Sequence, residues 1–277
     1  MPTRSIVEGL AYINWTILAG LAVGCFAAVV MLRLATDASR GFLGFSAVIA
    51  ALLGGLALVA DGAFPETPPS IAVPLDPALD VVRRAFLGGF VVLALVETAA
   101  IAARRRSVAI SLLGVASGVG ALIAAALGWA GLRPEGVPAA LQFLALAAAD
   151  GGALAALILG HWYLVTPRLS ERPLVMLARL LLAVVGVQAL LFATWLLTGA
   201  NAGLPPLDPL VGPAALFVWF RFIVGIGLPL AITWAAVQTA RSRSMESATG
   251  LLYIDLGLIA SGSILAAALW FGAGVLV

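Results

Sequence analysis

The sequence contains no lysine, one cysteine and one histidine, and these gaps exclude several kinds of chemistry. All fifteen basic residues in the 277-residue chain are arginine, which rules out Schiff-base chemistry and a lysine-type phosphate loop. Cys25 alone cannot form an intrachain disulfide, bind an iron–sulfur cluster or attach a covalent haem. His161 alone cannot supply the two ligands of an intrachain bis-histidine haem, and we expect no metal site. Any redox centre that serves this chain must be mobile or belong to a partner.

Charged residues are also scarce, at 10% of the chain, whereas 63% of the residues are hydrophobic. Soluble globular domains are typically about one quarter charged. A chain this apolar has too little polar surface to cover a soluble fold, so the composition predicts an integral membrane protein in contact with membrane lipids. The same numbers exclude a nucleic-acid-binding protein, a disordered chain and a disulfide-rich secreted domain.

Long apolar runs recur along the chain with polar breaks between them. Each run reaches the roughly 20 residues that a helix needs to cross the hydrocarbon layer, and runs this long are helices rather than barrel strands. The sequence therefore predicts an all-α fold with eight transmembrane helices, at residues 12–34, 42–62, 83–103, 108–131, 138–164, 174–199, 214–239 and 248–275. The first run lacks a short apolar core with a cleavage site, so we expect a retained helix rather than a signal peptide.

Arginine is distributed unevenly between the two sets of connections. Nine arginines lie at the first, third, fifth and seventh connections, and four lie at the other end. The nine are Arg33, Arg40, Arg104, Arg105, Arg106, Arg168, Arg172, Arg241 and Arg243; the four are Arg4, Arg83, Arg84 and Arg133. Because arginine-rich connections stay in the cytoplasm, we expect both termini outside and a multi-pass protein of the cell inner membrane.

The two halves of the sequence resemble each other. A shift of 137 residues gives nine identities over residues 84–107. The arginine and glycine identities are Arg84 with Arg221, Gly88 with Gly225, Arg104 with Arg241 and Arg106 with Arg243. A unit of four helices returns the chain to its starting side, so the copies are parallel rather than inverted. The sequence predicts two parallel four-helix repeats, residues 1–134 and 135–277.

Four titratable residues are predicted near the cytoplasmic ends of the helices. An ionisable group in hydrocarbon costs several kcal/mol unless it is paired or hydrated, so each such group is a candidate functional residue. Glu97 and His161 each precede an arginine by seven residues, which places them about 10 Å from the cytoplasmic face. Tyr253 and Asp255 lie one to two turns into the eighth helix. The four are candidates for a cofactor-binding cluster or a proton route.

Asp150 and Arg221 are predicted at matching heights in the outer leaflet. They lie 18 and 20 residues before Arg168 and Arg241, about 27 Å and 30 Å from those arginines at 1.5 Å per residue. We expect the two to pair, and they are the candidate catalytic residues. Asp150 and His161 are eleven residues apart, which places both on one helix face.

Three of the candidates also have a purely structural interpretation, whereas Asp150, which Gly151 and Gly152 follow, has none. Arg221 follows Trp219, as an interface arginine does. His161 begins a His-Trp-Tyr run that resembles an aromatic belt, and Glu97 can reach the arginines of 104–106. Gln142 and Gln188 are predicted to form hydrogen bonds between helices, as glutamines in membrane helices often do. No hydrolase, metalloprotease or phosphate-loop motif is present, so we do not expect catalysis by this chain alone.

Three short segments carry a resemblance to a known family. They are Trp15–Gly24 in the first helix, Trp219-Phe220-Arg221 in the seventh and Ser261-Gly262-Ser263 in the eighth. Together with eight helices in two units and no haem ligands, they resemble the haem-free membrane-anchor subunits of the polysulfide and dimethyl-sulfoxide reductase type. The resemblance implies an anchor that binds peripheral redox subunits and contacts quinone near one membrane face. The arginine that it implies after Gly262 is replaced by Ser263.

These observations favour a haem-free subunit of a respiratory or redox complex, with quinone near Asp150 and Arg221. In that hypothesis Asp150 accepts a proton from quinol and Arg221 stabilises the carboxylate by its opposite charge. A proton-coupled small-solute transporter, with Asp150 and His161 as coupling groups, is the first alternative. A structural membrane subunit without chemistry and a lipid-modifying enzyme are the others.

Overall fold

The computed structural model describes residues 8–64, 71–105, 107–130, 136–166, 169–199 and 205–277. Within these ranges the chain is helical and contains no strand. The long helices are α2 (Leu10–Ala35), α3 (Arg40–Gly62), α4 (Asp80–Ala102), α5 (Val108–Trp129), α6 (Gly136–Val165), α7 (Arg172–Thr198), α9 (Leu228–Arg241) and α10 (Met245–Ala273). The shorter elements are η1 (Pro77–Leu79), η2 (Asp208–Leu210), α8 (Ala215–Phe222) and the π-helical turn η3 (Ile223–Gly227).

Eight helical segments of the described chain are long and apolar enough to cross a membrane, with α8, η3 and α9 forming one of them. The prediction of an all-α protein with eight such helices is therefore confirmed, and the predicted ends differ from the observed ones by a few residues. The lipid-exposed backbone of a membrane helix has to satisfy its own hydrogen bonds, which is why apolar runs of this length fold as helices.

Capping residues and glycines set several of the helix ends. The side chains of Ser39 and Ser107 each accept a hydrogen bond from an amide N–H in the first turn of α3 and α5, which satisfies a donor that the helix leaves free. Gly199 and Gly274 follow α7 and α10 with φ values of 63° and 68°. This left-handed conformation ends a helix and favours glycine.

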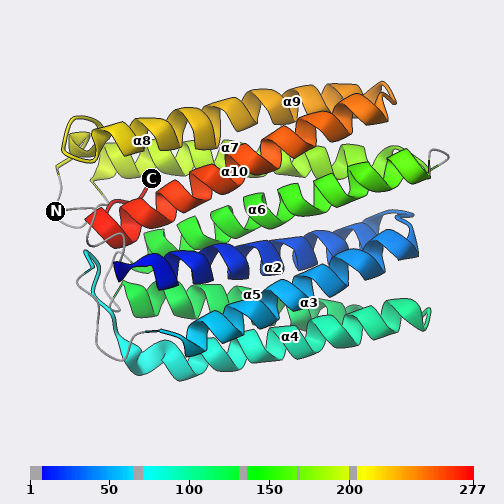
Figure 1. The fold of residues 1–277 in the computed structure, drawn as a ribbon, viewed down its shortest axis with the longest axis horizontal. Helices are drawn as coiled ribbons and strands as arrows, with labels where there is room; N and C mark the ends of the chain where they lie inside the picture. The colour runs from blue at the N-terminus through cyan, green and yellow to red at the C-terminus, as the bar shows by residue number, and fades with distance from the viewer. Residues whose placement is uncertain (1–7, 65–70, 106, 131–135, 167–168, 200–204) are drawn as a thin grey trace.

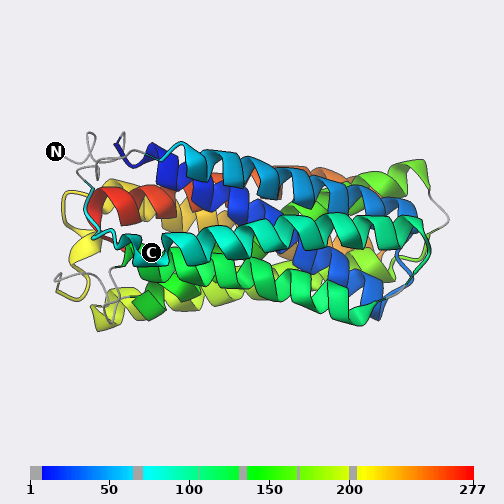
Figure 2. The ribbon, with the colours of Figure 1, turned by 90° about the horizontal axis from the view of Figure 1, so that it is seen from below.

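The helices run side by side in one long bundle (Figures 1 and 2). In the first half, α2 contacts α3, α3 contacts α4, α4 contacts α5 and α5 returns to α2. In the second half, α6, α7, α9 and α10 contact one another in the same cyclic order. We call these groups the first ring (α2–α5) and the second ring (α6–α10). The sequence repeat itself, with its boundary between residues 134 and 135, stays a prediction, because 131–135 lie outside the described residues.

Helices α2 and α6 form the centre of the bundle and join the two rings. Over their most apolar 18-residue stretches, 78% of α6 and 61% of α2 is buried, against 28% for the spans that contain α4 and α8–α9. The outer helices instead expose large apolar side chains, such as Leu52 and Val59 of α3 and Val81 and Val92 of α4. Such a surface is suited to contact with lipid.

Glycine allows α2 and α6 to approach closely. A Cβ atom at Gly24 would lie 1.8 Å from the carbonyl oxygen of Ala147, and one at Gly151 would lie 2.1 Å from the amide nitrogen of Cys25. No side chain fits in either place, so the two backbones pack directly, as small residues permit in membrane helices. This contact fixes Asp150, the neighbour of Gly151, in the middle of the protein.

The two ends of the bundle differ in charge. The connections α2–α3, α4–α5 and α9–α10 lie at one end (Figure 1), which we call the arginine-rich end because it carries Arg40, Arg104, Arg105, Arg241 and Arg243. The start of α2 and Val277 lie at the opposite end. The cytoplasmic location of the arginine-rich end stays a prediction, and Arg4, Arg106, Arg133 and Arg168 lie outside the described residues.

Candidate functional site

Glu97 of α4 and Arg33 of α2 form a buried ion pair in the first ring, towards the arginine-rich end. Arg33 donates to Oε1 of Glu97, and the Ser111 hydroxyl donates to the same oxygen at 2.8 Å. Arg33 also donates to the main-chain oxygen of Arg105. Oε2 of Glu97 is buried and has no hydrogen-bond partner within the described ranges. Glu97 therefore bonds to an arginine of α2 rather than to Arg104 or Arg105, and Arg106 lies outside the described residues.

A second buried ion pair lies at the opposite end of the first ring. Arg83 donates to the two carboxylate oxygens of Asp61, at 2.8 and 3.1 Å, and to Asp80 at 2.5 Å. Arg84, whose side chain is half exposed, donates to Asp61 as well. The Arg83 guanidinium also lies 5.2–5.8 Å from the ring centroids of Trp15, Phe64 and Trp129. Carboxylates and aromatic faces together neutralise this fully buried charge.

Arg221 of α8 is the buried arginine of the second ring, and its hydrogen-bond partners are one glutamine and two main-chain oxygens. Its Nη2 donates to the amide oxygen of Gln188 at 2.8 Å, its Nη1 to the main-chain oxygen of Gly225 at 3.0 Å and its Nε to an oxygen of Val277, the last residue of the sequence, at 3.4 Å. Among the described residues, no aspartate or glutamate oxygen lies within 4 Å of it. Arg221 is 2% exposed, and burying a guanidinium without an aspartate or glutamate partner is costly.

The π-helical turn η3 explains why one of these carbonyl groups is available. Leu228 donates to the carbonyl of Ile223, five residues earlier. Pro229 has no N–H to offer Gly225, four residues earlier. The Gly225 carbonyl receives a hydrogen bond from Arg221 instead. Turns of this kind are frequent at functional sites.

A small cavity lies beside Arg221, lined by Gln142, Ala145, Leu146, Gln188, Leu191, Trp195, Arg221 and Val277. About 10 Å³ of it is open to the centre of a water molecule, which is room for roughly one water. Gln142 is 2% exposed, and its amide oxygen accepts from the Val277 N–H at 3.1 Å. Its Nε2 donor has no partner among the described residues. Four side chains with N–H donors (Gln142, Gln188, Trp195 and Arg221) thus line a cavity whose other walls are apolar.

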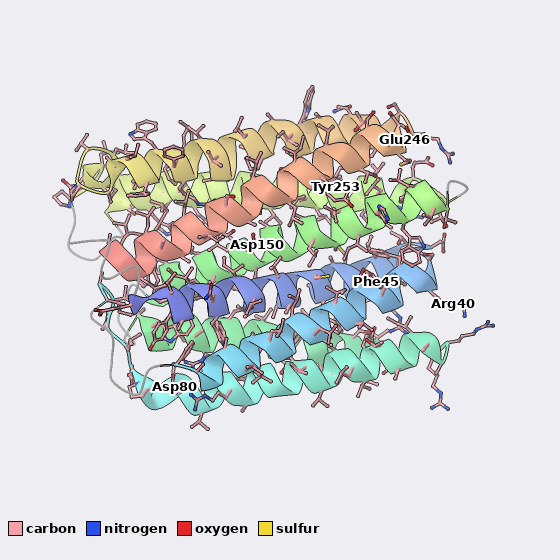
Figure 3. All side chains as sticks on the ribbon, viewed as in Figure 1. Arg40, Phe45, Asp80, Asp150, Glu246 and Tyr253 are labelled. Carbon is pink, nitrogen blue, oxygen red and sulfur yellow. The ribbon has the colours of Figure 1, made fainter. Side chains whose placement is uncertain are left out.

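Asp150 of α6 lies inside the bundle, away from both ends (Figure 3). Ser263 of α10 donates to its Oδ1 at 2.9 Å, whereas Oδ2 is buried without a partner. The predicted ion pair with Arg221 is not formed within 4 Å, because that guanidinium bonds to Gln188, Gly225 and Val277 instead. The two groups lie against adjacent residues of α10, since Ser263 bonds to Asp150 and a Cβ at Gly262 would lie 2.8 Å from Nη1 of Arg221.

Asp255 of α10 is fully buried against α9 and is also without an ion pair among the described residues. The Thr233 hydroxyl lies 2.6 Å from its Oδ2 and 2.6 Å from the main-chain oxygen of Pro229. A hydroxyl has one hydrogen to donate. Both contacts are full hydrogen bonds only when Asp255 is a neutral carboxylic acid that donates to Thr233. Its Oδ1 has no partner.

His161 and Tyr253 both lie on the exposed surface of the bundle, Tyr253 with half of its surface accessible. Figure 3 shows Tyr253 on α10, towards the arginine-rich end. The predicted cluster of Glu97, His161, Tyr253 and Asp255 is therefore not formed. Glu97 belongs to the first ring and Asp255 to the second, with α2 and α6 between them, so similar depth in the membrane did not bring them together.

Several residues that determine this arrangement were missed by sequence reasoning. Arg83 was assigned to a connection, yet it is buried, and its partner Asp61 was not considered. The sequence did contain an indication of this pair, because Asp61 lies at the end of one predicted helix and Arg83 at the start of the next. Consecutive antiparallel helices bring such ends together. Gln188 does bond between helices, since its Nε2 donates to the carbonyl of Ala145 at 3.0 Å. Ser263 gave no signal for its contact with Asp150.

No protein-family model matches the chain, and no curated protein matches it. The function has to be argued from the geometry above. The described residues contain no group of three or more His, Cys, Asp or Glu side chains placed to hold a metal ion. The arrangement that can bind a ligand is the Arg221 site, by which we mean Arg221, Gln142, Gln188, Asp150 and the cavity between the first three.

Proposed function

We propose that this chain is a haem-free membrane subunit of a redox complex and that the Arg221 site binds the head group of a quinone. The observation that carries the proposal is Arg221 itself, a buried guanidinium that has no aspartate or glutamate partner among the described residues and lies beside a cavity. Guanidinium and amide N–H groups suit a carbonyl oxygen, and apolar walls suit a ring. Gln142 has the unused amide donor.

Asp150 supports the same proposal. Oxidation of a quinol releases two electrons and two protons, so such a site needs a proton acceptor near its hydrogen-bond donors. Asp150 has an unpaired carboxylate oxygen and contacts the segment of α10 that also touches Arg221. In this proposal Arg221 and Gln142 orient the head group, and Asp150 accepts the two protons one after the other, passing the first to water before it takes the second. The electrons pass to peripheral subunits that carry redox centres.

A quinone ring is larger than the cavity, so side chains have to move before it binds. Leu191 and Trp195 of α7 line the cavity. Leu191 is partly exposed, so the cavity lies directly beneath the lipid-facing surface of the second ring. Movement of these two side chains would open the Arg221 site to the hydrocarbon layer, which is where quinones are dissolved.

Purification from native membranes in mild detergent tests the anchor function. We expect peripheral subunits with iron–sulfur or molybdenum centres to copurify, and their spectra to identify those centres. Isolation of the chain as a stable monomer without any redox partner would contradict the proposal.

Ligand binding tests the quinone site separately. We expect decylubiquinone to raise the thermal unfolding midpoint of the purified protein, and decylbenzene, which has the tail but no carbonyl groups, to leave it unchanged. Arg221→Met should abolish the response, whereas the matched control Arg179→Met, an exposed arginine of α7, should keep it. In the intact complex Asp150→Asn should retain binding and lose quinol oxidation. An equal response to the two compounds would show that only the tail is recognised.

Proton-coupled transport is favoured by a different observation, the unpaired oxygens on the buried carboxyl groups of Glu97, Asp150 and Asp255. The predicted coupling pair of Asp150 and His161 loses support because His161 is exposed, and Asp255 would take its place. Solute uptake into proteoliposomes that follows the pH gradient, and is lost in Asp150→Asn, would favour this function. A structural subunit would show neither uptake nor quinone binding.

A further inference from the structure

A pocket of about 400 Å³ lies at the arginine-rich end of the first ring. The α2–α3 connection forms one side of it and the turn between α4 and α5 forms the other. Its polar lining consists of Arg33, Thr36, Asp37, Arg40, Arg104 and Arg105. Arg33 is paired with Glu97, so the other three arginines against one aspartate give the pocket its net positive charge, and it is suited to an anion.

One of these arginines is part of the folded core. Arg33 is 9% exposed, pairs with Glu97 of α4 and donates to the main-chain oxygen of Arg105. These bonds tie α2 to α4 and make one wall of the pocket rigid. Arg40, Arg104 and Arg105 are exposed, so their guanidinium groups are free to contact a ligand.

The backbone around the pocket adds to its positive character. α3 begins at Arg40, and the Ser39 cap accepts the N–H groups of Phe42 and Leu43. The first amide groups of a helix have no partner within the helix, and its N-terminus attracts anions. On the other side of the pocket, Arg104 ends α4 with a φ of 56°. Glycine is the usual residue in this conformation. The backbone conformation of the turn therefore does not explain why an arginine stands at position 104.

We propose that this pocket binds the phosphate group of an anionic phospholipid. Arginine recognises phosphate through paired hydrogen bonds, and basic pockets at the ends of membrane helices are suited to lipid head groups. The neighbouring surface favours a lipid over a soluble phosphate. Phe45 and Val48 of α3 are exposed, Phe45 lies beside Trp162 of α6, and Figure 3 shows Phe45 close to the end that carries Arg40. The acyl chains of the lipid would lie along this apolar surface.

A second pocket at the same end provides a matched control. It is lined in part by Arg172, Arg179, Arg241 and Glu171, with a volume of about 630 Å³. All three of its arginines are exposed, and Glu171 is already paired with Arg243 at 3.4 Å. It has no buried arginine that ties two helices together, so we expect it to bind phosphate weakly.

Native mass spectrometry of the full chain with added lipid tests the proposal. We expect phosphatidylglycerol to bind in preference to phosphatidylcholine. The double variant Arg104→Gln/Arg105→Gln should weaken phosphatidylglycerol binding at least about tenfold. The control Arg172→Gln/Arg179→Gln, with the same change of charge, should change it less than about twofold. Arg33 is left in place because of its pair with Glu97, and unchanged thermal unfolding of both variants shows that the fold is intact.

Three outcomes would overturn the proposal. Equal losses in the two double variants would mean that only the overall charge matters. Equal binding of the two lipids would mean that the pocket does not recognise an anionic head group. If inorganic phosphate displaces phosphatidylglycerol at similar concentration, the pocket takes a soluble phosphate and the lipid is not its ligand. The pocket and the Arg221 site lie towards opposite ends of the bundle, so either result is independent of quinone binding.

Discussion

The first and second rings both bury charged side chains, but they compensate them differently. In the first ring Arg33 pairs with Glu97, and Arg83 pairs with Asp61. In the second ring the buried ionisable side chains are Asp150, Arg221 and Asp255, and none of them pairs with an oppositely charged side chain within the described part of the chain. Their partners are a hydroxyl, an amide or a main-chain oxygen.

This difference separates a structural role from a functional one. Two paired charges depend on each other, and removing one leaves the other buried without compensation, at a cost of about 3–5 kcal/mol. Removing a group that has no oppositely charged side chain beside it leaves no such charge behind. Ion pairing between side chains therefore does not explain the ionisable residues of the second ring, which is the reason for placing a ligand there.

The largest expected effect is that of Asp61→Asn. The substitution leaves Arg83 inside the protein with only the partly exposed Asp80 as a carboxylate partner. We expect the free energy of unfolding to fall by about 3 kcal/mol, measured by SDS titration in mixed micelles. Quinone binding at the Arg221 site should not change.

Arg84→Gln is the matched control for Asp61→Asn, since Arg84 bonds to the same carboxylate. Its side chain is 51% exposed, and exposed ion pairs contribute only about 0–1 kcal/mol. We expect a loss within that range. A loss as large as that of Asp61→Asn would show that burial does not distinguish the two arginines.

Glu97→Gln should have the next largest effect. Glutamine keeps an oxygen for Arg33 and Ser111 but removes the negative charge, so Arg33 becomes an uncompensated cation near the arginine-rich end. We expect the free energy of unfolding to fall by about 2 kcal/mol in the same SDS titration. The double variant Arg33→Met/Glu97→Met should recover much of this loss. A free energy of unfolding below that of Glu97→Gln would show that the broken Arg33–Glu97 ion pair is not the cause of the loss.

Arg221→Met should cost less stability and more function. It leaves the oxygens of Gln188, Gly225 and Val277 without a donor, which is expected to lower the free energy of unfolding by about 1–2 kcal/mol. The response of the unfolding midpoint to decylubiquinone should disappear. A stability loss equal to that of Asp61→Asn, with the response retained, would mean that the two arginines have the same structural role.

The smallest effects are expected for Asp150→Asn and Asp255→Asn. Neither carboxyl group has a charged partner to lose, and an asparagine oxygen can accept from Ser263 as the carboxylate does. At Asp255 an amide N–H can donate to Thr233 as a neutral carboxyl does. We expect each change in the free energy of unfolding to stay within about 1 kcal/mol in SDS titration, because removing the buried ionisable group offsets the amide N–H that is left without an acceptor. Losses near 2 kcal/mol would show that Asp150 and Asp255 contribute to stability as much as the paired charges of the first ring do.

The sequence was sufficient to predict the membrane helices. Composition and run length alone determine whether a segment such as α6 can cross a bilayer, and neither depends on how the helices pack. Depth in the membrane was predictable for the same reason, because it follows from the rise per residue. The approach of α2 to α6 was not predictable, since the contact of Gly24 with Ala147 depends on a crossing point that one sequence does not specify.

The candidate site was predicted only in part, because depth does not identify neighbours. Asp150 and Arg221 were correctly expected inside the helices, but their partners, Ser263 and Gln188, come from other helices whose rotation is set by packing. His161 illustrates the same limit. It shares a helical face with Asp150 by spacing, yet its end of α6 is exposed.

The ion pair between Asp61 and Arg83 has a consequence for how the chain is made. Asp61 lies in the last turn of α3 and Arg83 in the first turn of α4. The two side chains can therefore form their ion pair only after both helices have left the insertion machinery. A nascent chain with α3 alone in the bilayer would carry an unmatched carboxylate at considerable cost. Entry of α3 and α4 together, as a preassembled hairpin, avoids that intermediate. During biosynthesis the pair thus links the insertion of one segment to the synthesis of the next.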